Sequence, residues 1–245
     1  MNNSTPINAS FKKHEVEDYE RKRYRGIDQR IVHGRETRII RKILLRIRPN
    51  GQKEETDLQR ALDIPCGYGR FSSLLQVNGF SLVSSDLSFH MVKRAVDRYD
   101  NPERIPGVVA DAKLGLPFKP DAFFLLFSMR FFHHLHEKKD REAILKEFTR
   151  VTSDWMVLSY YQINRFHLFQ RKVRKRLLKK KTKIKMISRR EFQEEINGAG
   201  FEVVKVFPLF RGIHAHHIAL LRKQGSQMRN WGLSPFSRTG AGIRP

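Results

Sequence analysis

The stretch ALDIPCGYGRFSSLL, residues 61–75, places a strand, a glycine turn and a helix directly after one another. It begins with apolar residues, including Leu62 and Ile64, that suit a buried strand. A turn with Gly67 and Gly69 follows, and the apolar residues after the turn recur at helical spacing. This order is typical of the first half of a nucleotide-binding βα unit. The glycines would let the backbone approach a ligand, and the unpaired N–H groups of the helix favour its polar or acidic groups.

Two segments further along the chain place carboxylates where such a ligand needs them. A strand-like run at residues 80–85 ends at Asp86, about 20 positions after the glycine turn. A carboxylate at this place accepts hydrogen bonds from the hydroxyls of a ribose. Asp111 follows the short run at residues 107–110, and this position predicts a contact with the base of the same ligand.

Three motifs in this order resemble those of class I S-adenosylmethionine-dependent methyltransferases. They are DxPCGxG at residues 63–69, DLSxxM at residues 86–91, and ADA at residues 110–112 followed by LPF at residues 116–118. The resemblance covers roughly residues 58 to 160 and extends more weakly to residue 222. Pro65 stands where the usual family pattern has its first glycine. The resemblance implies a Rossmann-like α/β fold, with a mostly parallel seven-stranded sheet, helices on both faces and S-adenosyl-L-methionine as cofactor.

The same resemblance implies which residues hold the cofactor. We expect Asp86 to bind the ribose and Asp111 to contact the adenine, with Leu87 and Ala112 packed against the base. Asp63 would orient the glycine turn or meet the amino group of the cofactor. The simpler alternatives are helix or strand-end caps for Asp63 and Asp86 and an ordinary turn at Asp111. The expected cofactor-binding set is Asp63, Pro65, Cys66, Gly67, Gly69, Asp86, Leu87, Asp111 and Ala112.

Methyl transfer from a sulfonium is an in-line displacement, so the protein must position two groups and exclude water. A general base is needed only where the acceptor atom carries a proton. His133 and His134 follow the predicted fourth strand, residues 122–127, and are our candidates for a base or a substrate contact. The alternative is a pair of loop histidines without a chemical role.

Five further side chains are candidates for the substrate pocket. Arg130 lies in the same loop as the histidines, and Tyr160 and Tyr161 end the predicted fifth strand. Core packing is the alternative for both tyrosines. Tyr19 and Tyr24 would line the pocket if the N-terminal helices act as a lid over the cofactor. We predict no metal site, because His136, His214, His216 and His217 have no carboxylate or cysteine at ligand spacing.

The chain divides into four parts. We expect a disordered N-terminus at residues 1–10 and a helical cap and connector at 11–57, with helix breaks at Gly26 and Gly34. The methyltransferase domain would span residues 58–223 and end in two antiparallel strands, at residues 201–207 and 213–221. Before these strands, Ser188-x-x-Glu191 matches a helix capping box. Residues 224–245 are rich in Gly, Ser, Arg and Pro and read as a disordered tail.

The charge of the chain points to its partners. The net charge is +23, and residues 165–190 hold 13 Lys or Arg and no Asp or Glu. Aromatic and aliphatic residues recur on one side of this basic helical insertion before the sixth strand. The insertion could bind RNA or DNA phosphates, lie on an anionic lipid surface, or be a solvated helix.

The single cysteine, Cys66, excludes an internal disulfide and suits a reducing compartment. The N-terminus has no apolar segment typical of a signal peptide, and the longest apolar run is too short to cross a bilayer. We therefore expect a cytoplasmic protein, with peripheral attachment at the inner membrane surface as the alternative. The predicted activity is methyl transfer to a small or lipid-linked acceptor. An RNA methyltransferase that uses the basic surface, or a non-catalytic binding or scaffold protein, is the alternative.

Overall fold

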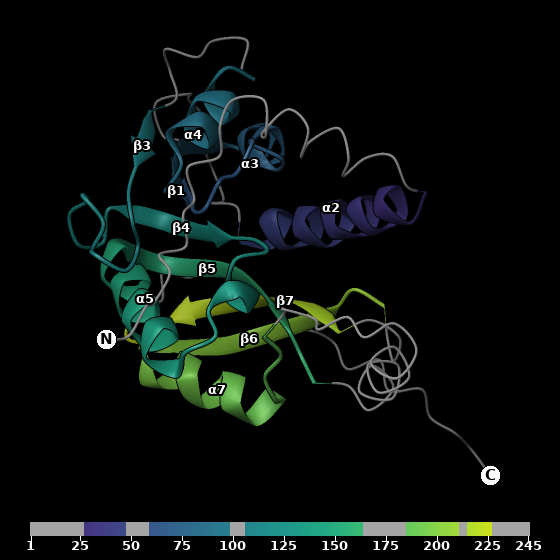
Figure 1. The fold of residues 1–245 in the computed structure, drawn as a ribbon, viewed down its shortest axis with the longest axis vertical. Helices are drawn as coiled ribbons and strands as arrows, with labels where there is room; N and C mark the ends of the chain where they lie inside the picture. The colour runs from purple at the N-terminus through teal and green to yellow at the C-terminus, as the bar shows by residue number, and fades with distance from the viewer. Residues whose placement is uncertain (1–26, 48–58, 99–105, 164–184, 211–214, 227–245) are drawn as a thin grey trace, which may run out of the picture.

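Seven strands form one sheet in the described part of the chain (Figure 1). The computed structural model describes residues 27–47, 59–98, 106–163, 185–210 and 215–226. The strands are β1 (Gln59–Asp63), β2 (Phe80–Asp86), β3 (Gly107–Val109), β4 (Phe123–Ser128), β5 (Thr152–Tyr161), β6 (Phe201–Pro208) and β7 (His216–Lys223). Their order is β3-β2-β1-β4-β5-β7-β6, with β7 antiparallel to both neighbours and the other pairs parallel. The mostly parallel seven-stranded sheet predicted from the sequence is thereby confirmed.

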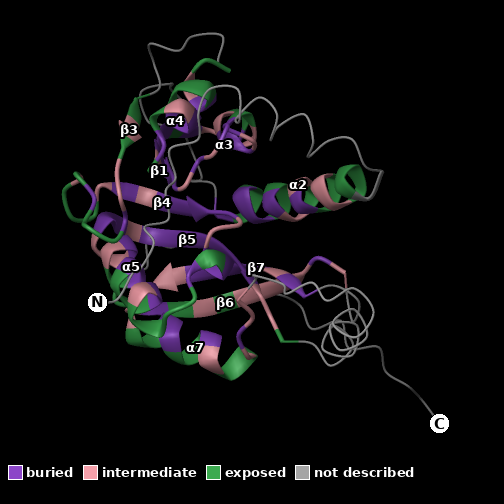
Figure 2. Cartoon of the chain, in the orientation of Figure 1, coloured by how far each residue is buried: buried purple, intermediate pink, exposed green. Residues whose placement is uncertain are grey.

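Helices cover both faces of this sheet (Figure 2). They are α2 (Ile27–Ile47), α3 (Ser72–Val77), α4 (Phe89–Val96), α5 (Lys138–Val151) and α7 (Arg189–Gly198), with a short 3-10 turn at Phe132–His134. Apolar residues of α2 and α3 pack on one face, and those of α5 and α7 pack on the other. α4 packs against β2 and β3 at the opposite end of the sheet from β6.

Alternation along the strands assigns side chains to these two faces. In β1, Ala61 belongs to the core under α2 and Leu62 to the core under α5. In β5, Trp155 and Val157 face α2, whereas Met156 faces α5. Because central strands are covered on both sides, they read as continuous apolar runs and not as alternating ones.

The predicted helix break at Gly34 is wrong, because α2 continues through this position. A glycine inside a helix costs about 1 kcal/mol relative to alanine. The helix is held by four fully or nearly buried apolar side chains, Ile40, Ile43, Leu44 and Ile47. A Cβ at Gly34 would meet nothing within 4 Å, so no contact depends on the residue. Tertiary burial therefore outweighs the local preference.

The end of the domain follows the prediction more closely. Ser188 caps α7, since its hydroxyl accepts a hydrogen bond from the N–H of Glu191 (3.0 Å), which confirms the capping box. The last strand begins at His216, three residues after the predicted start at Ile213, which lies outside the described residues.

Several predicted segments lie wholly or mostly outside the described residues. They are the N-terminus at 1–10, the first part of the cap with Tyr19, Tyr24 and Gly26, most of the basic insertion 165–190, and most of the tail 224–245. Within the residues that are described, no helix combines the length and apolar character needed to span a bilayer.

Candidate functional site

The glycine turn lies across the carboxyl ends of the central strands. β1 ends at Asp63, and the N–H of Ile64 donates to the carbonyl of Phe127 in β4 (2.9 Å). The N–H of Cys66 donates to the carbonyl of Ser85 in β2 (2.8 Å). The turn is thus tied to both neighbours of β1. Ligands of open α/β sheets bind at this edge, where the strand order reverses.

The two glycines of the turn have different surroundings. Both have positive φ, 52° at Gly67 and 75° at Gly69, a conformation that other residues adopt rarely. A Cβ at Gly69 would lie 2.9 Å from the Cα of Ala95 in α4, so this glycine permits close packing on the helix. A Cβ at Gly67 would meet nothing within 4 Å. The open side predicted for both glycines is therefore present at Gly67, whereas α4 fills the space beside Gly69.

This difference predicts separate effects for two matched substitutions. Gly69→Ala should lower the free energy of unfolding by about 2–4 kcal/mol, because a methyl group is forced against backbone at positive φ. Gly67→Ala should cost only about 1–2 kcal/mol, from the backbone conformation alone. It should also weaken S-adenosylhomocysteine binding, because its methyl group projects into the open side. Urea unfolding and calorimetry measure the two effects, and equal losses of stability in both variants would contradict the assignment.

Asp86 is held against the turn by its carboxylate. Oδ2 accepts from the N–H of Gly67 (3.0 Å), and Oδ1 accepts from the N–H of Ser88 (3.0 Å). Burial raises the pKa of Asp86, and these N–H groups oppose the increase. Each carboxylate oxygen can accept a further hydrogen bond, so the geometry fits a ribose whose two hydroxyls donate to it.

The residues beside Asp86 fit an adenine. The N–H of Ala110 donates to the carbonyl of Asp86 (3.1 Å), which brings the 110–112 turn next to the end of β2. Asp111 Oδ1 accepts from the N–H of Lys113 (2.9 Å), and Ala112 is buried. The side chain of Leu87 is 42% exposed and offers an apolar surface that a base could cover. The residues predicted to bind the ribose and the adenine are therefore neighbours, and their roles in cofactor binding stay predictions.

Asp63 ends β1 just before the turn, and Pro65 and Cys66 lie in its first part. Asp63 is buried, and its Oδ2 accepts from the hydroxyl of Ser72 at the start of α3 (3.3 Å), as an orienting role requires. Pro65 follows a cis peptide bond from Ile64. Burial raises the pKa of the Cys66 thiol well above its usual value, so this cysteine stays protonated and packs as a small turn residue.

Asp63 should make the stability of the ligand-free protein depend on pH. Burial, reinforced by the charge of Asp86, raises its pKa from 3.8 to about 8. Between these values the folded state keeps a proton that the unfolded state has lost, so the free energy of unfolding falls as pH rises. The slope approaches about 1.4 kcal/mol per pH unit. Asp63→Asn should remove this contribution in urea unfolding and leave that of Asp86, and parallel profiles for variant and wild type would contradict the prediction.

The two tyrosines at the end of β5 point to opposite faces of the sheet. Tyr160 is fully buried, stacks on Phe192 of α7 with ring centroids 3.8 Å apart, and donates its hydroxyl to Gln162 (2.9 Å). It therefore packs in the core. Tyr161 faces the side of α2, where its ring stacks on His216 (5.0 Å). Of the two candidate pocket residues, only Tyr161 lies on the α2 side with the other candidates.

His133 and His134 lie in the 3-10 turn after β4, but their surroundings differ. His133 is buried, with its ring 4.7 Å from that of Tyr161, whereas His134 is exposed. Arg141 of α5 holds this loop through hydrogen bonds to the carbonyls of Leu135 (3.1 Å) and His136 (3.0 Å). The predicted catalytic pair is thus separated into one recessed imidazole and one solvent-facing imidazole.

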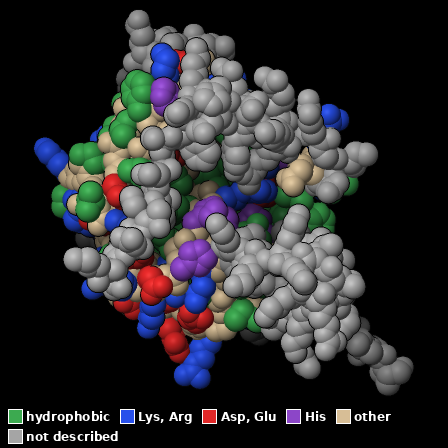
Figure 3. Space-filling view, in the orientation of Figure 1, with side chains coloured by type: hydrophobic (Ala, Val, Ile, Leu, Met, Phe, Trp, Pro, Cys, Tyr) green, Lys and Arg blue, Asp and Glu red, His purple; other side chains and the backbone are tan. Residues whose placement is uncertain are grey.

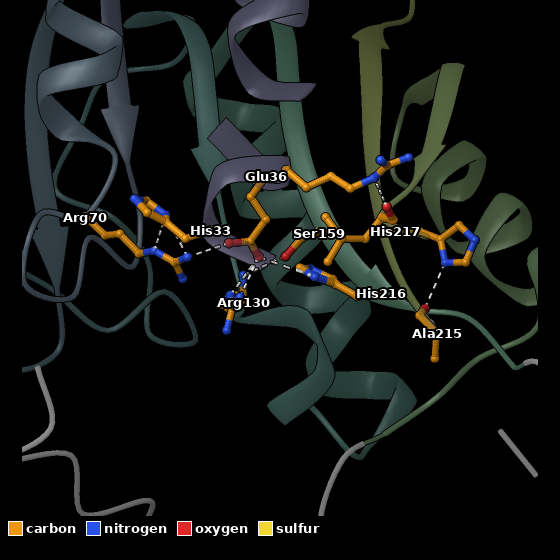
Figure 4. A network of polar contacts seen from close by, with 10 residues as sticks. His33, Glu36, Arg70, Arg130, Ser159, Ala215, His216 and His217 are labelled. Carbon is orange, nitrogen blue, oxygen red and sulfur yellow. Dashed lines mark hydrogen bonds and ion pairs between the residues drawn. The ribbon is translucent and has the colours of Figure 1, made fainter. Parts of the chain in front are cut away.

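A buried carboxylate that sequence reasoning missed joins the loop after β4 to the residue that follows the glycine turn (Figure 4). Glu36 of α2 is fully buried, and its carboxylate binds Arg130 (2.6 Å) and Arg70 (2.6 Å). The Nδ1 of His216 lies 3.4 Å from the same carboxylate. The signal was present in the sequence, because Glu36 lies on the same helical stripe as Ile40 and the other buried residues of α2.

Strand alternation explains why these groups meet. Ser159, Tyr161 and His216 occupy positions of β5 and β7 that face α2, and Tyr161 is paired with His216 in the register of the two strands. Because β7 is antiparallel, it begins where β5 ends and so contributes His216 to the ligand edge. Figure 3 shows histidine side chains beside Lys or Arg near the middle of the side of the molecule that is turned to the viewer. Among the described residues, no group of three His, Cys, Asp or Glu could hold a metal ion.

Comparison with known proteins agrees with this geometry. Residues 62–154, which include the glycine turn, Asp86, Asp111 and His133, match the family model described as "Methyltransferase domain". No curated protein sequence matches the chain.

Solved structures show the same fold at low sequence identity. Magnesium protoporphyrin IX methyltransferase from Synechocystis, with bound S-adenosylhomocysteine, aligns with a TM-score of 0.68 and 14% identity over 84% of this chain and 94% of its own. An S-adenosylmethionine-dependent methyltransferase from Methanosarcina mazei aligns with a TM-score of 0.57 and 18% identity over 69% and 93%. One from Leishmania major gives a TM-score of 0.58 and 15% identity over 85% and 82%.

The family match and the geometry of the cofactor residues lead to one conclusion. The match covers the segment that carries the open glycine turn and the two carboxylates, and the sheet has the strand order on which these groups meet. Residues 62–154 form a methyltransferase domain by this match, and the chain has the class I, Rossmann-like fold of solved methyltransferases that hold S-adenosylmethionine or S-adenosylhomocysteine.

Proposed function

We propose that this enzyme methylates a small or lipid-linked acceptor that enters beside His133, Tyr161 and Arg130. The observation that carries the proposal is the burial of the groups on the acceptor side. Glu36 and His216 are fully buried, and His133 is 7% exposed. A narrow acceptor, or the headgroup of a lipid, can reach His133 and the partly exposed Arg130 beside these buried groups, whereas a folded macromolecule would have to insert a single residue or base.

The chemistry divides between the cofactor and the chain. When bound, S-adenosylmethionine supplies a methyl group on a sulfonium, which is already a good leaving group. Asp86 and the open side of Gly67 would hold the adenosine, and the bond of Asp63 with Ser72 joins the two ends of the turn that carries Gly67. Helix α2 packs on the sheet face that carries Tyr161, and its Glu36 binds Arg70 and Arg130 at the ligand edge.

His133 is our proposed general base for an acceptor atom that carries a proton. Its backbone carbonyl accepts from the N–H of Lys185 (3.0 Å), and Arg141 fixes the loop on its other side. The backbone of His133 and of the residues after it is therefore fixed, which suits proton transfer in a defined direction.

A specific observation also favours an RNA acceptor as the second candidate. The net charge of +23 would attract a polyanion, and the basic insertion at residues 165–190 carries 13 of the cationic side chains. Residues 164–184 lie outside the described structure, so this candidate rests on charge alone.

Radiolabelled methyl transfer distinguishes the two candidates. Purified enzyme and methyl-labelled S-adenosylmethionine are incubated with separated small-molecule, lipid and RNA fractions of cell extract. Label in the small-molecule or lipid fraction supports the proposal, and label that nuclease releases from the RNA fraction overturns it. Asp86→Ala, which removes the ribose carboxylate, should abolish labelling, whereas Asp97→Ala on exposed α4 surface serves as the matched control.

A further inference from the structure

The cluster around Glu36 contains more positive than negative charge. Arg130 donates to Glu36 Oε1 from Nε (2.9 Å) and Nη2 (2.6 Å), and Arg70 donates to Oε2 from Nη2 (2.6 Å). The Glu36 side chain is fully buried, whereas those of Arg70 and Arg130 are 10% and 16% exposed. One inaccessible carboxylate thus faces two guanidinium groups that a ligand can still reach.

His33 does not change this balance. Its Nδ1 lies 3.0 Å from Arg70 Nε and 2.8 Å from Arg70 Nη2, and a guanidinium nitrogen only donates. His33 Nδ1 must therefore accept and carries no proton. Burial and the charge of Arg70 also lower the pKa of His33. The charges on Glu36, Arg70 and Arg130 leave one positive charge without a counterion among them.

Arg130 is held in place by an unusual backbone. Its φ is 59°, a left-handed conformation that is uncommon for a long side chain. Its N–H donates to the hydroxyl of Ser159 on β5 (2.6 Å), which fixes the residue there. Backbone strain of this kind persists where the surrounding structure enforces it and clusters at ligand sites.

Both arginines retain donors for another anion. Among the described residues, the side-chain hydrogen bonds of Arg70 and Arg130 use Nε and Nη2, and none uses Nη1. A guanidinium can bind a second oxygen group along its free edge while it keeps the first. Arg70 follows the glycine turn after β1, and Arg130 follows β4. Because β1 and β4 are paired and parallel, both arginines lie at the same end of the sheet, the ligand edge.

An aromatic wall adjoins this charge. His216 lies 3.4 Å from Glu36 and stacks on Tyr161, whose ring lies 4.7 Å from that of His133. The ring of Tyr161 is partly exposed, so a planar organic molecule could pack on it while a negative group reaches the arginines.

We propose that Arg70 and Arg130, bridged by Glu36, form a subsite for an anionic oxygen group of the acceptor, a carboxylate or a phosphate. This inference rests on the proposed function and narrows its substrate class to anionic acceptors. Glu36 is a positioning residue, because it aligns both guanidinium groups and is itself too deeply buried to touch the ligand.

Matched probes test the charge requirement without methyl transfer. Benzoate and benzamide have nearly the same shape and differ in charge. We measure their binding by calorimetry to protein saturated with S-adenosylhomocysteine, in buffer without phosphate, together with acetate and inorganic phosphate. We expect benzoate to bind at least about tenfold more tightly than benzamide. Equal affinities, or no saturable binding of any of the three anions, would overturn the subsite.

Arginine variants test its location. Arg130→Gln should remove the preference for benzoate, Arg130→Lys should keep part of it, and Arg38→Gln on the exposed side of α2 should leave it unchanged. Circular dichroism confirms that each variant is folded. If Arg130→Gln weakens S-adenosylhomocysteine binding while the benzoate preference survives, the arginines serve the methionine carboxylate of the cofactor and the proposal is wrong.

The acceptor itself provides an independent result. Cell extract is separated on an anion exchanger before the labelling experiment, and we expect the active acceptor in the retained pool. An acceptor found only in the unretained pool would sink the subsite but leave the small-acceptor function standing. If benzoate binding depends on Arg130 but the methyl label appears only in RNA, the subsite stands and the small-acceptor function is wrong.

Discussion

Arg141→Met should lower the free energy of unfolding by about 3–5 kcal/mol, the usual cost of leaving one partner of a buried ion pair alone. The side chains of Arg141 and Glu195 are each 1% exposed and are joined by bonds of 2.6 and 2.9 Å. The pairing with Glu195 raises the pKa of Arg141, so the charge is always present. Without it, Glu195 of α7 would be buried as an uncompensated carboxylate.

Two further variants show whether the unpaired charge is the cause. Arg190→Met removes an ion pair of the same type at a side chain that is 90% exposed, and should change stability by less than about 0.5 kcal/mol. Arg141→Met combined with Glu195→Met should recover part of the loss, because apolar replacement of a buried pair is often neutral, whereas the bonds of Arg141 to the carbonyls of Leu135 and His136 stay lost. Chemical unfolding measures all three, and a double variant no more stable than Arg141→Met would refute this explanation.

His133→Asn should lower kcat about 100-fold or more, the typical contribution of a general base. The affinity for S-adenosylhomocysteine should stay the same, because His133 lies on the acceptor side of the ligand edge, beside Tyr161. His134→Asn is the matched control, since this neighbouring imidazole is exposed and its ring centroid lies 4.1 Å from that of His133. Its kcat should remain near that of the wild type.

Chemical rescue by free imidazole shows whether His133 acts as a base or only shapes the loop. His133→Gly leaves space for free imidazole, which should restore part of the lost kcat in a concentration-dependent way. Rates are measured with the acceptor fraction identified by methyl labelling. A kcat that falls equally in His133→Asn and His134→Asn, or that imidazole does not raise, would show that the loop needs its shape and not the chemistry of His133.

The cofactor half of the protein was predictable because its signals are local. The strand before Asp63, the glycine turn and the carboxylate of Asp86 lie in short segments whose order alone indicates the βα units. The hydrogen bond from Gly67 to Asp86 is the direct consequence of this order. The role of Gly69 was less accessible, since it depends on Ala95 in a helix that follows the second strand.

The acceptor half depends on contacts between distant parts of the chain. Tyr160 and Tyr161 are adjacent and similar, and only the pairing of β5 with β7 shows which of them faces α2. Glu36 and Arg130 are 94 positions apart, so no local pattern joins them. A carboxylate on the apolar stripe of α2 signals a buried polar contact, but the sequence does not name its partners.

The position of Glu36 and His216 outside residues 62–154 has a consequence for how this enzyme is compared with its relatives. Proteins that share the catalytic module but carry different flanking segments would handle the same methyl donor and choose different recipients. Exchange of the leading helix between such enzymes should therefore redirect selectivity while leaving donor affinity intact. Similarity within residues 62–154 therefore indicates the methyl donor, whereas the flanking segments determine which molecule receives the methyl group.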